Sequence, residues 1–341
     1  MSSFVPPCCP NESCPSRLPG ATFTHRPAGQ YVRKVDGRVV PRIRCLTCER
    51  RFSEQTFRAD YFQKKPALNE ALYPLLVSKV SHRQAARVVG CNRKSVMRRI
   101  PLLGRIARAV HEHLAPRRDP AAFLKGGFLL DELETFAKSR RNDPLTVPAV
   151  VHDQTLFVVH VEVGPLPRRG GTGRDEAEPD PLSEEERAER NRGSKVAVRA
   201  CLDGLAKLVP SEGRVQVGSD MKHAYPEALC EVFGERLEHT VTHSTVPRTA
   251  DSPLATVNHL FAQMRDGVSR LVRRNWGHSK LASQLRHHLW VWVSYRNYVR
   301  GITNGCWEKT AAMVVGACSR KLAAAEILRW APAYVAMLLA V

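Results

Sequence analysis

Five of the ten cysteines lie within residues 8–48, in pairs whose spacing is that of metal ligands. Cys45 and Cys48 form a CxxC motif, and Cys9 and Cys14 form a wider CxxxxC motif about thirty residues earlier. Two turns that aim thiolates at one point give a closed, tetrahedral zinc site. We therefore predict that these four cysteines hold a structural Zn²⁺ ion in a zinc ribbon.

The segment between the cysteine pairs supports this prediction. Residues 30–45 alternate like a β-hairpin that turns at Asp36–Gly37. Cys8 is an alternative to Cys9 as a ligand, although the CPNxxC pattern favours Cys9. Unrelated buried thiols or a disulfide are the other interpretation, but so short and charged a segment has little else to hold it folded.

A pair of short helices is predicted within residues 80–100. Ala85 and Ala86 permit close helix contact, Gly90 lies at the turn, and Val96 returns the second helix to the core, which is helix-turn-helix spacing. An ordinary helical hairpin with a solvated basic face is the alternative. The predicted DNA-binding residues, suited to phosphates and guanine edges, are Arg83, Arg93, Lys94, Ser95, Arg98 and Arg99.

Two aspartates in the centre of the chain, Asp131 and Asp220, end apolar segments with strand character. Two carboxylates that meet at one point hold a pair of Mg²⁺ or Mn²⁺ ions about 4 Å apart. Such ions activate an attacking oxygen and stabilise the leaving oxygen at a phosphodiester. If the fold did not bring Asp131 and Asp220 together, they would be ordinary solvated acids. The prediction of a metal site therefore depends on how the strands that carry them are arranged.

The elements follow the order βββαβαβα, which is the ribonuclease-H arrangement. In that arrangement the first and fourth strands lie side by side, so Asp131 and Asp220 at their ends would converge. Residues 165–195 are rich in Gly, Pro and charge, and are predicted to form a surface insertion without chemistry. The predicted strands are 127–136, 146–153, 155–164, 214–220 and 237–243, and the predicted helices are 194–209, 225–234 and 255–274.

Several segments resemble DDE-type transposases of bacterial insertion sequences. They are "DELETFAKSRRN", "SDMKHAYPEAL", "SRLVRRNWGHSK" and "SYRNYVR". The resemblance is to the insertion-sequence-one kind, in which a zinc ribbon and a helix-turn-helix precede the nuclease, and it covers nearly the whole chain apart from 165–195. It rests on the order of the motifs. The resemblance implies that Asp131 and Asp220 occupy the first two acidic positions and that Asn258 stands at the third.

The predicted helix 255–274 has apolar residues at intervals of three and four, and Ser252–Pro253 is predicted to start it. Asn258 borders the apolar stripe, whereas Asp266 points to water. An amide oxygen can ligate Mg²⁺ but adds no charge, so the second metal would be held more weakly, with support from His259, or from Glu132 and Glu134. An ordinary surface residue is the alternative for Asn258. The basic residues predicted to line DNA beside the site are Arg270, Arg273 and Arg274.

The charge of the chain favours a polyanionic partner. The net charge is +19, and residues 1–118 contribute +16 of it, with 23 Lys and Arg against seven Asp and Glu. Double-stranded DNA is the expected partner. The polar start and the short apolar run at the end predict neither a signal peptide nor a membrane span, and the metal-like cysteines predict a reducing compartment, the bacterial cytoplasm with its nucleoid.

These features predict a multi-domain α+β/α/β protein. The predicted domains are a zinc ribbon (1–58), a helix-turn-helix (59–118), a ribonuclease-H-like domain (119–300) and a C-terminal helical segment (301–341). The expected function is a transposase that binds terminal inverted repeats, cleaves DNA and joins the 3′ end to target DNA, as a homodimer or higher homo-oligomer. The alternative is a catalytically weakened or inactive derivative that regulates by binding DNA.

Overall fold

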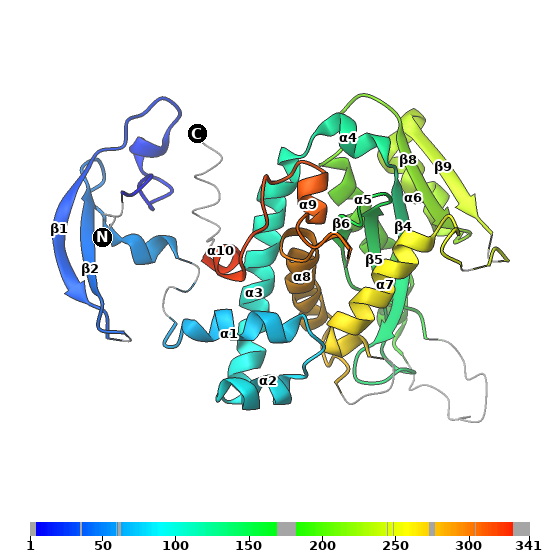
Figure 1. Ribbon diagram of the computed structural model, residues 1–341, viewed down its shortest axis with the longest axis horizontal. Helices are drawn as coiled ribbons and strands as arrows, with labels where there is room; N and C mark the ends of the chain where they lie inside the picture. The colour runs from blue at the N-terminus through cyan, green and yellow to red at the C-terminus, as the bar shows by residue number, and fades with distance from the viewer. Residues whose placement is uncertain are drawn as a thin grey trace.

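The structure is a computed structural model with a small β-sheet at the amino terminus and a larger body in which helices lie on both faces of a mixed sheet (Figure 1). None of the described helices is long and apolar enough to cross a membrane. The structure describes residues 5–34, 36–58, 60, 63–168, 182–243, 245–247, 249–272, 277–303 and 305–329.

The amino-terminal sheet is a three-stranded antiparallel meander in the order β1-β2-β3. Its first two strands form the predicted hairpin, and Gly37 in the turn has a φ of 70°, a conformation that favours glycine. The elements are η1 (Pro15–Arg17), β1 (His25–Val32), β2 (Val39–Cys45), β3 (Arg51–Ser53) and η2 (Glu54–Phe57).

Next come helices whose ends are set by local sequence signals. Ser81 caps α2 in a capping box with Gln84, and Gly90 ends it in the left-handed conformation at φ 67°. Asn92 then caps α3 by accepting a hydrogen bond from the Lys94 backbone N–H at 2.8 Å. The predicted helix, turn and helix are thus present. The elements are α1 (Ala67–Leu76), α2 (His82–Val89), α3 (Arg93–Leu114), η3 (Ala115–Arg117) and α4 (Pro120–Lys125).

The central sheet has the strand order β6-β5-β4-β8-β9, with the short β7 paired to β5. The first three strands are antiparallel neighbours, while β4, β8 and β9 run parallel to one another. The predicted neighbours, the strand carrying Asp131 and the strand ending at Asp220, are therefore paired. The strands are β4 (Phe128–Phe136), β5 (Pro144–His152), β6 (Val158–Val161), β7 (Gly164–Pro165), β8 (Val215–Asp220) and β9 (Leu237–Thr242).

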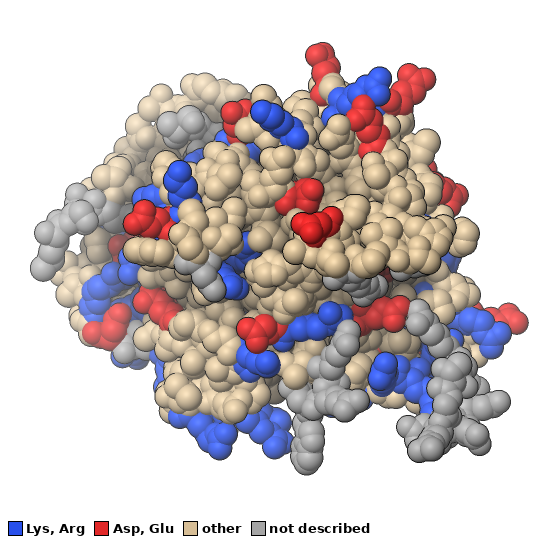
Figure 2. All heavy atoms as spheres, turned by 45° about the vertical axis from the view of Figure 1, so that its right-hand side comes forward, with Lys and Arg blue, Asp and Glu red and all other residues tan. Residues whose placement is uncertain are grey.

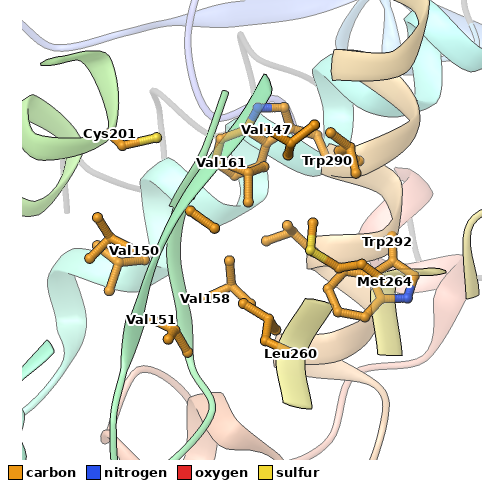
Figure 3. Packing of buried hydrophobic residues seen from close by; sticks show 14 of the residues in the cluster. Val147, Val150, Val151, Val158, Val161, Cys201, Leu260, Met264, Trp290 and Trp292 are labelled. Atoms are coloured by element: carbon orange, nitrogen blue, oxygen red, sulfur yellow. The ribbon is translucent and has the colours of Figure 1, made fainter. Parts of the chain in front are cut away.

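Helices cover the sheet on two sides. Figure 3 shows Cys201 of α5 and Val150 on one side of the sheet, and Leu260 and Met264 of α7 on the other, beside Trp292 of α8. The remaining elements are α5 (Glu184–Ala206), α6 (Ala224–Phe233), η4 (Gly234–Arg236), α7 (Ala255–Gly267), η5 (Ser269–Leu271), α8 (Ala282–Tyr298), α9 (Ala311–Val314) and α10 (Ala324–Arg329).

Two predicted helix boundaries are wrong. The helix α5 begins at Glu184, inside the segment predicted as an insertion, because Ser183 and Glu186 form a capping box that starts it. The helix α7 begins at Ala255, after a turn in which the Ala255 N–H donates to the Ser252 carbonyl, and it ends at Gly267. Residues 273–276 of the predicted helix, like 169–181 of the predicted insertion, lie outside the described residues.

One large hydrophobic cluster joins α1–α4, the central sheet and α5–α10, whereas a second, small cluster surrounds the cysteines of the first sheet. Trp290, Trp292 and Tyr298 on α8 are buried in the large cluster, and Tyr295 of the same helix is partly buried against it. The helix pair α2–α3 is therefore packed into the same core as the sheet, across the predicted boundary at 118/119. Only the first predicted domain has an apolar cluster of its own among the described residues.

Candidate functional site

The four predicted zinc ligands converge. The sulfur atoms of Cys9, Cys14, Cys45 and Cys48 all lie within 4.8 Å of one another, with 3.4 Å between Cys9 and Cys48 and 3.8 Å between Cys14 and Cys45. Zn–S bonds of about 2.3 Å in a tetrahedron require sulfur atoms about 3.8 Å apart. The donor set therefore fits a structural zinc ion. Cys8 is not part of this group.

Hydrogen bonds lower the pKa of two of these thiols, Cys45 and Cys48, whereas burial raises the pKa of Cys9. Burial also raises the pKa of Cys45, but hydrogen bonds from the backbone N–H groups of Cys48 and Thr47, together with those of the Cys9 and Cys14 thiols, outweigh it and lower the pKa to about 6. A backbone N–H of Arg50 likewise lowers the pKa of Cys48. Because the thiolate is the metal ligand, backbone donors that favour the thiolate favour the metal. The CxxC turn thus positions the sulfur atoms of Cys45 and Cys48 and also favours their negatively charged thiolate form.

The second candidate centre begins with Asp131 and Asp220. Strands β4 and β8 are paired in parallel as far as Leu130 and Ser219, so the two aspartates are the next residues in the same register. Residues in register on adjacent strands point to the same face of a sheet. The prediction that both aspartates end their strands is half correct: Asp220 is the last residue of β8, but Asp131 is the fourth of nine residues in β4, which continues beside β5.

Helix α7 covers the face to which the two aspartates point. Asp131 pairs with Ala149 of β5, on the same face as Val147. Figure 3 shows Val147 beside Trp290, on the side of the sheet where Leu260 and Met264 of α7 also lie. Val257 and Leu260 of α7 are buried against this core, and the neighbouring Asn258 is half-buried. In contrast, the side chain of Asp266 is 83% exposed, as predicted, and it pairs with Lys79.

The two aspartates also act electrostatically on one group. Burial raises the pKa of the Tyr225 hydroxyl, and the carboxylates of Glu132, Asp131 and Asp220 raise it further, in that order. Three carboxylates are thus gathered near one phenol. They do not form a compact three-carboxylate cluster, because the cysteine group is the one such ligand group among the described residues.

Glu132, next to Asp131, lies on the opposite face of β4 because successive strand residues alternate. Its side chain is 7% exposed and forms an ion pair with Lys222. One carboxylate oxygen accepts hydrogen bonds from Thr146 Oγ1 at 2.5 Å and Ser194 Oγ at 3.1 Å, and the other accepts one from Tyr225 Oη at 3.1 Å. Glu132 is therefore fully engaged under α5 and α6 and is not placed to assist the aspartates.

Lys222 connects the two faces. Its Nζ pairs with Glu132 and donates to Ser194 Oγ at 2.8 Å, while its backbone N–H donates to Asp220 Oδ1 at 3.1 Å. The Glu132 network thus anchors the turn that holds the Asp220 carboxylate. This role of Lys222 was not predicted from the sequence. The signal that could have indicated it is the position of the lysine, two residues after the aspartate that ends the strand.

The proposed assistants of the site lie elsewhere. His259 is exposed, and its Nε2 is 2.6 Å from Gln263 Nε2 on the same helix. Glu134 is exposed on the Glu132 face of β4. Neither residue therefore lies on the face of its element to which the two aspartates point.

Most of the predicted DNA-binding residues of α2 and α3 are exposed. Arg83, Arg93, Lys94 and Arg98 are exposed, and Ser95 is half-buried. Figure 2 shows Lys and Arg side chains gathered at the lower edge of the molecule, at the height of α2 in Figure 1. The exception is Arg99, half-buried, whose guanidinium donates to the Lys65 carbonyl at 2.8 Å.

The predicted basic run after α7 is only partly described. Arg270, which was predicted to line DNA beside the site, is 7% exposed and donates from Nη1 to Ser279 Oγ at 3.0 Å. The reason is that α7 ends at Gly267, and the following 3₁₀ turn carries Arg270 inward. Arg273 and Arg274 lie outside the described residues.

The candidate functional residues therefore fall into three groups. They are the four cysteines, the aspartate pair on the sheet face covered by α7, and the basic residues of α2 and α3. Only the cysteines form a complete ligand set on their own. Comparison with known proteins adds no relative, because no protein-family model and no curated protein matches the chain.

Proposed function

We propose that this chain is a DDE-type transposase of a bacterial insertion sequence, with a ribonuclease-H-like catalytic domain. It would bind the terminal inverted repeats of its element through the zinc ribbon and α2–α3. It would then cleave the DNA to free a 3′ hydroxyl and join that hydroxyl to target DNA, as a homodimer or higher homo-oligomer because two ends must be paired.

The observation that carries the proposal is the register of Asp131 and Asp220. The two residues are 89 positions apart in the chain, yet they occupy matching positions on adjacent parallel strands and face the helix that bears Asn258. Two carboxylates in matching positions on adjacent strands repel each other, because both carry negative charge. A shared divalent cation would offset that repulsion.

The residues fit divalent metal ions. Carboxylate and amide oxygens are the donors that Mg²⁺ and Mn²⁺ prefer. When bound, such ions stabilise the attacking and leaving oxygens of an in-line displacement at phosphorus. In that arrangement Asp131 and Asp220 orient the reacting phosphodiester, Asn258 contributes a neutral oxygen donor, and the Glu132–Lys222 pair keeps Asp220 in position.

A second function is favoured by one observation, the amide of Asn258 where the family resemblance implies a carboxylate. With one negative charge fewer, the site would bind its second metal more weakly. A catalytically inactive descendant that regulates by binding DNA would retain the zinc ribbon and the basic helices. Both functions share the amino-terminal third, so only the chemistry separates them.

The test is metal-dependent cleavage of the terminal repeats that flank the gene of this protein. We expect Mn²⁺ or Mg²⁺ to support nicking and Asp220→Ala to reduce it by at least about 1000-fold, that is about 4 kcal/mol. Asp266→Ala is the matched control, because that carboxylate is 83% exposed on the outer side of α7. Equal inactivity of the wild type and Asp220→Ala would favour the regulator, and cutting without strand joining would indicate a nuclease unrelated to transposition.

A further inference from the structure

A basic cavity lies where the helix pair α2–α3 meets the segment after α7. It has a volume of about 600 Å³ and no Asp or Glu in its described lining. The cavity is distinct from the aspartate pair, which is on the sheet. Its titratable lining residues are His82, Arg83, Arg93, Arg270, His278 and Lys280.

Arg270 is the most unusual of these residues. It is 7% exposed, and its one hydrogen bond among the described residues goes to the neutral hydroxyl of Ser279. Its Nε atom is buried without a partner. Burial lowers the pKa of Arg270 to about 10, so the side chain still carries its charge at neutral pH. A buried cation without a counter-charge costs several kcal/mol, and an anion in the cavity would offset that cost.

One other group in the cavity has an unmet hydrogen bond. The buried ring nitrogen His82 Nε2 has no hydrogen-bond partner. Burial, together with the charges of Arg270 and Arg93, lowers the pKa of His82 to about 3, which means that both guanidinium groups act on this ring. An anion between them would relieve the mutual repulsion of the cations. It would also accept a hydrogen bond from Arg270 Nε and, in the tautomer that carries its proton on Nε2, one from His82.

The helices add to the positive potential. Ser81 caps α2 and Arg93 is the first residue of α3, and both residues line the cavity. The amino terminus of α2 therefore opens at the same place as the guanidinium groups, and α3 adds the side chain of its first residue. Backbone N–H groups and macrodipoles at helix amino termini favour anions, phosphate above all.

We propose that this cavity binds a phosphate group, with Arg270 as its buried anchor and Arg83, Arg93 and Lys280 at its mouth. The planar guanidinium of Arg270 matches a phosphate oxygen pair in geometry and charge. We assign the phosphate to the backbone of the DNA that α2–α3 would hold, since Arg83 and Arg93 are also exposed on that helix pair. This assignment of the source rests on the proposed function, whereas phosphate binding itself does not.

The first experiment uses the full-length, zinc-loaded protein and inorganic phosphate as the probe. Phosphate at 20 mM should raise the Tm by about 2 °C over chloride at equal ionic strength. Arg270→Met should abolish that shift. The matched control is Arg214→Met, which removes an exposed arginine paired with Glu238 at the sheet edge and should keep the shift. If Arg270→Met does not fold, the double variant Arg83→Met/Lys280→Met, which changes only the mouth, carries the test.

A second experiment identifies the source of the phosphate. Binding of the terminal-repeat duplex is measured over a range of salt, and loss of one phosphate contact in Arg270→Met should reduce the slope of log K against log salt by about 1. An unchanged slope, with the phosphate shift lost, would assign the cavity to a free phosphate. Failure of the wild type to bind DNA would overturn the proposed function but not phosphate binding. Equal Tm in phosphate and chloride for the wild type would overturn the cavity proposal itself.

Discussion

The cysteine group and the aspartate pair differ in how far the protein completes each set of donors. The four sulfur atoms are within 4.8 Å of one another, mostly buried, and surrounded by their own small apolar cluster. Asp131, Asp220 and Asn258 are half-buried and come from three separate elements. A closed donor set is typical of a structural metal, and an open one leaves positions for substrate.

Glu132 extends the comparison to two neighbouring carboxylates of one strand. It accepts hydrogen bonds from Thr146, Ser194 and Tyr225 and pairs with Lys222, so its charge is fully neutralised. Asp131 faces the other way, toward the α7 side of the sheet. Strand alternation alone therefore places these two neighbouring carboxylates on opposite faces of the sheet.

The largest effect should come from breaking the closed cysteine set. Cys45→Ser removes one of four thiolates whose zinc complex supplies the folding energy of the small sheet, so we expect loss of tightly held zinc and of order in residues 5–58. Zinc content by mass spectrometry and amide exchange measure the two effects. Cys230→Ser, at an exposed cysteine outside the group, is the control. Full zinc content in Cys45→Ser would refute the ligand assignment.

The next largest effects are expected from variants of Asp131 and Glu132, which should differ in nicking rate and in the free energy of unfolding. If the proposed function holds, Asp131→Asn should reduce metal-dependent nicking by at least about 1000-fold. It should leave the free energy of unfolding nearly unchanged, because the amide oxygen can still accept the hydrogen bond from the Glu132 backbone N–H. Glu132→Gln should do the opposite, with a loss of about 1–2 kcal/mol of stability and nicking retained within about tenfold. Nicking rates and urea unfolding separate the two results. If both variants lose the same property, the contrast between the two faces is wrong.

A smaller effect tests the network around Glu132. Lys222→Met leaves a carboxylate with a 7% exposed side chain without its cation, which should lower the free energy of unfolding by about 3 kcal/mol. Glu132→Gln in the same protein should restore part of that loss. Lys195→Met is the matched control: its pair with Glu227 is 65–69% exposed at 3.8 Å, and such pairs contribute little. Equal unfolding curves for the two single variants would show that the network does not stabilise the fold.

The sequence predicted the parts of the molecule whose signals are local. Cysteine spacing identified the four thiols that converge and could hold a metal. The spacing of Ala85, Ala86, Gly90 and Val96 identified the helix pair. The pairing of the strands that carry Asp131 and Asp220 also followed from the order of the elements. What remained hidden depends on contacts across the fold: Lys222 meets Glu132 across 90 residues, and no local spacing reveals that ion pair.

The missed boundaries have related causes. The first turns of α5 have no apolar period because they extend beyond the sheet, so only the capping box at Ser183 marks their start. The apolar period after α7 continues through Leu271, because the 3₁₀ turn keeps Val268 and Leu271 buried although the helix ends at Gly267. The period of apolar residues in a sequence shows which residues are buried. The type of element that buries them is an inference from that period.

The smallest expected effect is a change in the affinity of the proposed aspartate site for a metal ion. Asn258→Glu adds a carboxylate on the half-buried side of α7, so we expect the affinity for a second Mn²⁺ ion to rise about tenfold, or about 1.4 kcal/mol. His259→Glu places the same charge one residue further along, on an exposed position directed away from the sheet, and should change that affinity little. Mn²⁺ titration followed by electron paramagnetic resonance measures both. Equal affinities in the two variants would mean that charge at residue 258 does not reach the metals, and that the third position must lie on another residue.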